Sequence, residues 1–210
     1  MMCKIEEELD YEIKWRVDEI SMIKTIPFLY RMNECHKDLF MKYAIPAIYA
    51  LWEGFVVSSF EIYIRKLNEI NFSNQKTHIN IITYELENRF KFCELRKDIN
   101  KKIELAQNLM DFFLSEFTLS NSKINTESNV NFKVINNILK TFNLKVFEKD
   151  LFESKLNKLL NYRNKIAHGE TSVRVNSDIV VELSQTVISC MDNLRDIIIE
   201  EIKTKNYITS

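Results

Sequence analysis

The chain has 210 residues, of which 46% are hydrophobic and 28% charged, and its formal net charge at pH 7 is -1. This composition is typical of a globular protein with ample material for a core, and the near-zero charge excludes a broad cationic surface that holds nucleic acid by counterion release. Two glycines and two prolines are too few for a many-turned β-sandwich or a glycine-looped α/β enzyme, and they favour long helices with few tight turns.

Two long helices are predicted at the start of the chain. Apolar residues recur at helical spacing through residues 4–32, which indicates an amphipathic helix. The helix predicted over residues 37–71 holds the most hydrophobic stretch, "YAIPAIYALWEGFVVSSFEIYI", and is either a buried central helix or a membrane span. Glu53 and Glu61 favour the buried helix, since charges in mid-bilayer are costly. Pro46 is expected to kink this helix or to open a fresh first turn.

The rest of the chain is predicted to be helical as well. After "NFSNQK", helical periodicity resumes over residues 79–117, with a break expected near Asp98. Residues 118–131 are the longest polar run and are predicted to form a loop. Three further helices are expected over residues 132–142, 150–168 and 177–205. The segment "SVRV" is a candidate for weak strand pairing. Without a repeat or a sheet pattern, the economical interpretation is a single all-α domain over residues 1–210.

The cysteines and the charge pattern predict a cytoplasmic protein without a metal site. No C-x-x-C pair links the four scattered cysteines, so we expect reduced thiols: Cys3, Cys35, Cys93 and Cys190. The acidic opening "MMCKIEEELDYEIKW" lacks the apolar segment of a secretory signal. The clearest basic stretch, over residues 89–102, is diluted by acids and is interpreted as a solvated helix face.

Arg163 is an arginine on the apolar face of a predicted helix. At about 100° per residue, one stripe holds Arg163 near its middle together with Leu156, Leu159, Leu160, Ile166 and Ala167. A guanidinium there loses water and needs partners. Its head could reach solvent past the stripe, pair with a carboxylate from another helix, of which Glu53 is the obvious candidate, or line a cleft for an anion.

His168 is followed directly by Gly169. Glycine just past a helix end commonly takes the left-handed turn that terminates the helix, so His168 is predicted to be the last helical residue or the cap. Asn164, four residues earlier on the same face, is expected to hydrogen-bond the imidazole and to choose its tautomer. The alternative interpretation is a helix-terminal cation that interacts only with the helix dipole.

Arg163, Asn164 and His168 together spell R-N-x-x-x-H. This pattern resembles the R-x(4-6)-H signature of the HEPN superfamily, and "YRNKIAHGE" is close to its form in toxin-type HEPN ribonucleases of bacteria. Residues 40–70 and 127–170 are similar to that branch in the same order. The resemblance implies an all-α HEPN-like helical bundle with an up-and-down core and extra helices.

The same resemblance implies metal-independent RNA cleavage without a cofactor, and a partner antitoxin or a role in phage defence. Arg163 and His168 would be the catalytic pair, Asn164 the supporting polar residue, and Glu53 a recurrent acid of the second helix. Glu170 stands where some HEPN toxins carry a tyrosine that a nucleotidyltransferase antitoxin modifies, so that mode of control is unsupported.

A homodimer is expected because one histidine per chain can act as both acid and base only if two chains meet. An apolar stripe that carries an arginine suits a symmetric interface, so residues 152–168 are predicted to lie in it. Two other functions stay open at this point. One is a catalytically silent HEPN module that binds a nucleotide or a protein through the same cleft, and the other is a helical scaffold in which Arg163 and Glu53 form a core ion pair.

Overall fold

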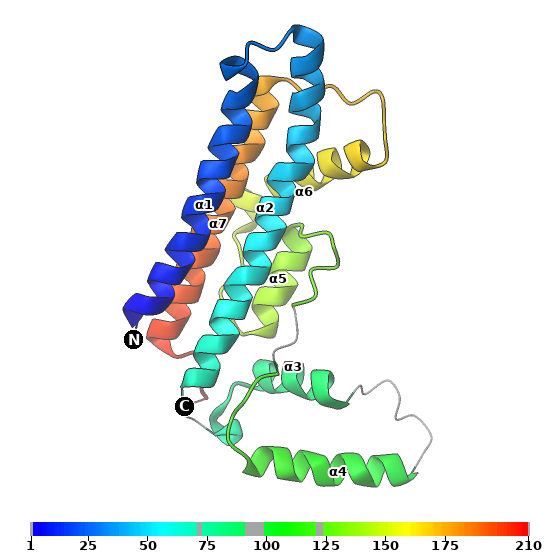
Figure 1. Ribbon diagram of the computed structural model, residues 1–210. Helices are drawn as coiled ribbons and strands as arrows, with labels where there is room; N and C mark the ends of the chain where they lie inside the picture. The colour runs from blue at the N-terminus through cyan, green and yellow to red at the C-terminus, as the bar shows by residue number, and fades with distance from the viewer. Residues whose placement is uncertain (1, 71–72, 91–98, 121–123, 210) are drawn as a thin grey trace.

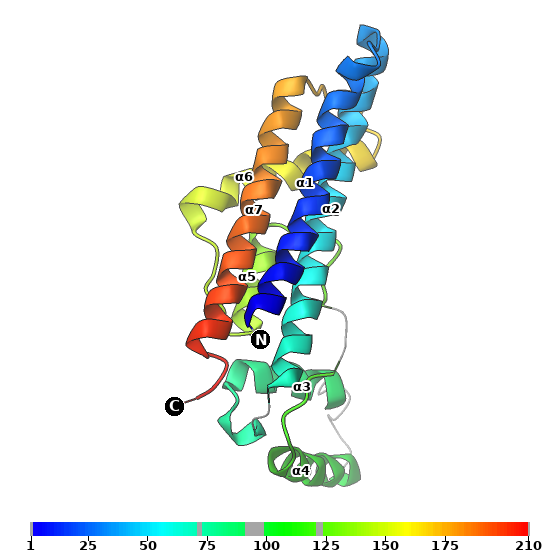
Figure 2. The same ribbon diagram turned by 60° about the vertical axis from the view of Figure 1, so that its left-hand side comes forward.

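Four long helices build the main bundle of the computed structural model, which describes residues 2–70, 73–90, 99–120 and 124–209. Helices α1, α2 and α7 run side by side along the molecule, and α6 packs against α2 and α7 (Figures 1 and 2). Their bounds are Met2–Leu29 (α1), Glu34–Glu69 (α2), Lys149–Ala167 (α6) and Ser177–Thr204 (α7). The described residues contain no strand, so the all-α prediction is confirmed.

Helix α2 is buried at the centre of the bundle, as its all-round apolar sequence predicts. By length and composition it could cross a membrane, but 61% of its most apolar window is buried under the rest of the protein. Asn33 caps its start, because the side chain accepts a hydrogen bond from the backbone N–H of His36 at 2.9 Å. The helix continues through Pro46, so the expectation of a fresh first turn there is wrong.

The smaller elements lie at one end of the bundle and along its side (Figure 1). They are η1 (Asn74–Lys76), α3 (Ile79–Phe90), α4 (Ile99–Leu114) and α5 (Phe132–Thr141). Helices α3 and α4 occupy the segment predicted to be helical over residues 79–117, and the break expected near Asp98 lies outside the described residues. The basic stretch 89–102 also falls largely outside them.

Two predictions about irregular segments have different outcomes. The described part of residues 118–131 is not helical, as predicted, although Leu119 and Val130 anchor it in the core. The segment 172–175 forms no strand, and the β-bridges among the described residues are isolated pairs elsewhere. Cys35 and Cys190 are free thiols as expected, and the side chains of Cys3 and Cys93 lie outside the described part.

Glu201 is a carboxyl group enclosed near the end of α7, with 4% of the residue exposed. Its Oε2 accepts a hydrogen bond from the Asn206 amide at 3.2 Å, and its Oε1 has no hydrogen-bond partner. Burial therefore raises the pKa of Glu201 from 4.5 to about 7, with the Asn206 bond opposing the shift.

We expect stability to depend on pH through Glu201. A raised pKa means that the folded protein holds this proton more tightly than the unfolded chain does, so its contribution is fully present below pH 4.5 and is lost as pH rises to about 7. The shift corresponds to about 3 kcal/mol.

Glu201→Gln should remove this loss, so the variant should have a larger free energy of unfolding than wild type at pH 8. Urea unfolding at pH 5 and pH 8 measures the difference, with Glu200→Gln as the exposed control on the same helix. Equal pH dependence in wild type and Glu201→Gln would contradict the assignment.

Candidate functional site

The turn that carries His168 is a well-formed helix terminus. Helix α6 ends at Ala167, His168 is the C-cap, and Gly169 has φ +76°. The N–H of Gly169 donates to the carbonyl of Ile166 and the N–H of Glu170 to that of Lys165, both at 3.0 Å. This pair of bonds is the Schellman motif, which uses a left-handed residue after the cap. The predicted roles of Gly169 and His168 at the helix end are therefore confirmed.

The two glycines of the chain are expected to respond in opposite ways to alanine. At Gly169 a Cβ would meet no atom within 4 Å, so the cost is the left-handed backbone, roughly 1–2 kcal/mol. At Gly54, inside α2, a Cβ would meet only Arg16 Nη2 at 3.6 Å, and alanine in a helix interior should stabilise by about 0.5–1 kcal/mol. Urea unfolding of the two variants tests this. A Gly169→Ala protein as stable as wild type would contradict the strained turn.

The turn is also tied to α2. Lys42 Nζ donates to the backbone oxygen of Glu170 at 2.9 Å, and the His168 side chain is exposed beside this contact. Among the described residues, no hydrogen bond or ion pair of the His168 imidazole is found. The expected bond from Asn164 is absent, because the Asn164 Oδ1 accepts from Arg163 Nη1 at 2.8 Å instead. Asn164 therefore supports the arginine and not the histidine.

Arg163 is half-buried, and neutral groups surround its guanidinium. The Cζ atom lies over the Tyr49 ring, 4.8 Å from the centroid. Nη1 also approaches Asn129 Oδ1, and Nη2 approaches the backbone oxygen of Ser128, both at 3.4 Å. The partners come from three segments: α2, the loop before α5, and α6 itself.

The described structure shows no direct ion pair between Arg163 and Glu53, and the expected alternative, a water-bridged contact between them, stays a prediction. The Glu53 Oε1 accepts a hydrogen bond from Thr126 Oγ1 at 2.7 Å, and the Glu53 charge acts on the neighbouring Tyr49 hydroxyl. Burial and the Glu53 charge raise the pKa of Tyr49 to about 12, so its hydroxyl remains a donor at neutral pH. Arg163 thus contacts the Tyr49 ring, and the Glu53 charge acts on the Tyr49 hydroxyl, without a direct ion pair between Glu53 and Arg163.

A comparison with the other enclosed arginines shows what is unusual about Arg163. Of the described arginines that are not exposed, Arg16 pairs with Glu12 at 2.5 Å and Arg195 pairs with Asp10 at 2.8 Å. Among the described residues, no carboxylate lies within 4.0 Å of the Arg163 guanidinium. Because desolvated positive charge is stabilised by a counter-charge, this site favours an anion from outside the chain.

Sequence analysis missed the residues that hold the guanidinium. Tyr49 had no signal of its own within an apolar helix, and Ser128 and Asn129 belong to a polar run that predicts only a loop. The loop takes its shape from left-handed residues, Glu127 at φ 52° and Ser128 at φ 53°. Val130 then fixes it to α2, because its N–H donates to the Tyr49 hydroxyl at 2.6 Å.

The apolar stripe of α6 is covered within the protein itself. Leu156, Leu159 and Ile166 are buried, where α6 packs against α2 and α7, whereas Ala167 is exposed. The apolar stripe therefore does not by itself require a second chain. The homodimer, with residues 152–168 in its interface, stays a prediction that depends on the two-histidine chemistry.

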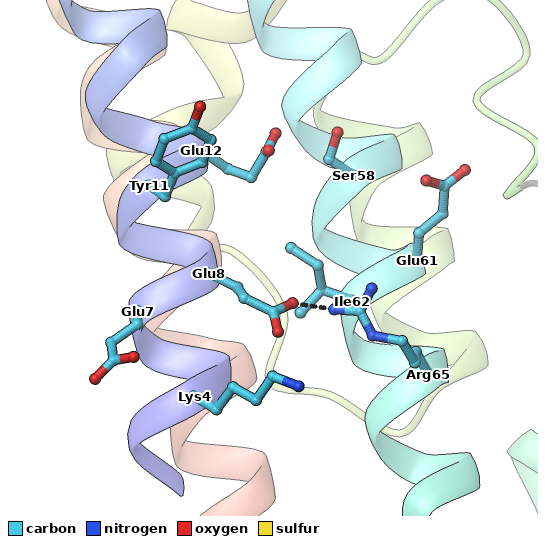
Figure 3. A pocket seen from close by; sticks show the side chains of 9 residues that line it. All are labelled: Lys4, Glu7, Glu8, Tyr11, Glu12, Ser58, Glu61, Ile62 and Arg65. Carbon is cyan, nitrogen blue, oxygen red and sulfur yellow. Dashed lines mark hydrogen bonds and ion pairs between the residues drawn. The ribbon is translucent and has the colours of Figure 1, made fainter. Parts of the chain in front are cut away.

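The groove between α1 and α2 is separate from these residues (Figure 3). It encloses about 510 Å³ and has acidic and basic side chains on its walls, including the ion pair of Glu8 with Arg65. Neither Arg163 nor His168 contributes to it. Within the described residues, no group of three or more His, Cys, Asp or Glu side chains could hold a metal ion.

Comparison with known proteins gives one match. The model of the family described as RiboL-PSP-HEPN matches residues 11–200, a span that includes Arg163, Asn164 and His168. No curated protein and no solved structure matches the chain.

Proposed function

Because this chain belongs to the RiboL-PSP-HEPN family, we propose that it is an endoribonuclease that cleaves RNA without a metal ion. HEPN domains are associated with nucleotide and RNA functions, and many are ribonucleases. The observation that carries the proposal is the half-buried Arg163 guanidinium, which neutral groups hold and no carboxylate of the described residues neutralises. A phosphodiester of RNA supplies the missing negative charge.

The exposed His168 provides the second part of the chemistry. One imidazole removes the proton from the ribose 2′-OH, and the oxygen attacks the adjacent phosphorus. The bond from phosphorus to the 5′ oxygen breaks, and a second, protonated imidazole gives that oxygen its proton. A group that titrates near neutral pH can perform either step. Arg163 stabilises the charge that develops on the phosphoryl oxygens. The products are a 2′,3′-cyclic phosphate and a 5′-OH end.

Two copies of the chain supply the two histidines. His168 lies uncovered at a helix terminus, where a second protomer and a substrate can both reach it. We place the enzyme in the cytoplasm as the toxin of a toxin–antitoxin or phage-defence system, with a cognate antitoxin as its partner. The resemblance of "YRNKIAHGE" to toxin-type HEPN ribonucleases supports this part of the proposal.

The alternative function is a catalytically silent HEPN module that binds a nucleotide or a protein through the same residues. It is favoured by the absence of any hydrogen bond from the described residues to the His168 imidazole, because nothing in the single chain orients the ring for proton transfer. The two functions differ in whether bound RNA is cut.

The test is incubation of the purified protein with single-stranded RNA in excess EDTA. Cleavage should occur, the products should carry 2′,3′-cyclic phosphate and 5′-OH ends, and DNA of the same sequence should stay intact, because it lacks the nucleophile. Binding without cleavage would favour the silent module. Cleavage that needs Mg²⁺ would overturn the mechanism, as would a protein that sediments as a stable monomer at the active concentration.

A further inference from the structure

Tyr49 contacts both Arg163 and the loop that supplies two of its partners. The residue is 2% exposed, and its ring lies under the Arg163 guanidinium, 4.8 Å from Cζ to the centroid. Its hydroxyl accepts the N–H of Val130 at 2.6 Å. One buried side chain on α2 therefore joins the motif helix to the loop before α5.

We propose that Tyr49 is a positioning residue that fixes the Arg163 guanidinium for phosphate binding. This inference rests on the proposed function and deepens it, because it names what orients the arginine of that site. The ring attracts the cation through its face and sets the plane of the fork. The hydroxyl holds Val130, so the preceding residues Ser128 and Asn129 stay within reach of Nη1 and Nη2.

The hydrogen-bond inventory of Arg163 fits this role. An arginine carries five N–H donors, and three hydrogen bonds run from Arg163 to Asn164, Asn129 and Ser128. Among the described residues, two of its N–H groups therefore have no acceptor. Two is the number that a bidentate contact to a phosphate uses. Three N–H groups of the guanidinium are thus bonded to the protein, and the other two are available to a phosphate.

The contact of Glu53 with Thr126 bears on the unpaired state of Arg163. Glu53 is one helical turn from Tyr49 on the same face of α2, and its Oε1 accepts a hydrogen bond from Thr126 Oγ1. A carboxylate held in this way remains close without forming an ion pair with Arg163. A direct pair would occupy the donors that the substrate needs.

The test is a double-mutant cycle on RNA cleavage in EDTA. Tyr49→Leu removes both the ring and the hydroxyl, and a guanidinium displaced by about 1 Å is expected to lower kcat about 100-fold, with a smaller change in KM. Tyr49→Phe keeps the ring and should lose less. In an Arg163→Ala background, Tyr49→Leu should cause no further loss, since the tyrosine acts through the arginine.

Tyr63 is the matched control. It is a fully buried tyrosine on the same helix, and its hydroxyl has no hydrogen-bond partner in the described structure. Tyr63→Phe and Tyr63→Leu should leave kcat unchanged, although the leucine variant loses stability as Tyr49→Leu does.

The outcomes separate the two proposals. The role of Tyr49 would be overturned if wild type and Tyr49→Leu both cut RNA while Arg163→Ala does not. The proposed ribonuclease function would survive that result. Additive losses from Tyr49→Leu and Arg163→Ala would also overturn the role of Tyr49. Wild type that cuts no RNA would overturn both.

Discussion

Replacing His168 with alanine should lower the rate of RNA cleavage in EDTA by about two to four orders of magnitude, the range of general acid–base catalysis. Stability should change little, because the side chain is exposed at the helix cap and its imidazole makes no hydrogen bond with described residues. The favourable interaction of a cation with the helix terminus is about 0.3–1 kcal/mol. Single-turnover cleavage and thermal unfolding of the same preparation measure the two effects. A folded His168→Ala protein that still cuts RNA would exclude the histidine from the chemistry.

Mixing wild type with excess His168→Ala protein provides the control for the two-histidine site. A mixed dimer contains one His168, which cannot be both acid and base in one turnover. Cleavage should therefore fall below the value that the fraction of wild-type chains predicts. If the cleavage rate falls only in proportion to the fraction of wild-type chains, one His168 is sufficient for cleavage.

Arg163→Lys should be nearly as damaging as Arg163→Ala, with a loss in kcat of about two to three orders of magnitude for the alanine variant. Lysine keeps the charge but not the planar fork that lies over Tyr49 and bonds Asn164 and Asn129. Arg163 has no carboxylate partner among the described residues, so its replacement leaves no buried carboxylate unpaired. We therefore expect the free energy of unfolding to fall by about 1–2 kcal/mol, from the loss of one good hydrogen bond and the ring contact.

Arg65→Lys is the matched control for the arginine. This residue is exposed on α2 and pairs with Glu8 in the groove of Figure 3, away from Arg163. Its cleavage rate should equal that of wild type. Full activity in Arg163→Lys would show that charge alone is sufficient and would contradict a role for the fork.

The helices could be predicted from the sequence because their signals are local. Helical periodicity predicted α1, α2, α5, α6 and α7 to within a few residues at each end. Three of the described helices begin at asparagine caps, Asn33, Asn131 and Asn176. Gly169 marked the end of α6 by the same kind of short-range chemistry.

The partners of Arg163 could not be predicted because they depend on packing between distant segments. The sequence indicated the correct central helix but the wrong residue, since Tyr49 and not Glu53 touches the guanidinium. Asn129 reaches Arg163 only because Glu127 and Ser128 adopt left-handed backbone. The stripe on α6 was correctly identified as apolar, but the pattern does not say which surface covers it.

The packing of α1 along α7 has a consequence for synthesis on the ribosome. These helices lie side by side in both views (Figures 1 and 2), although nearly the whole chain separates them in sequence. Helix α7 also covers α6, so Arg163 and His168 are translated before the helix that completes their support. A nascent chain that has just made the motif therefore still lacks a folded site. On the proposed function, we expect no cleavage of the message that is being read until α7 has left the exit tunnel.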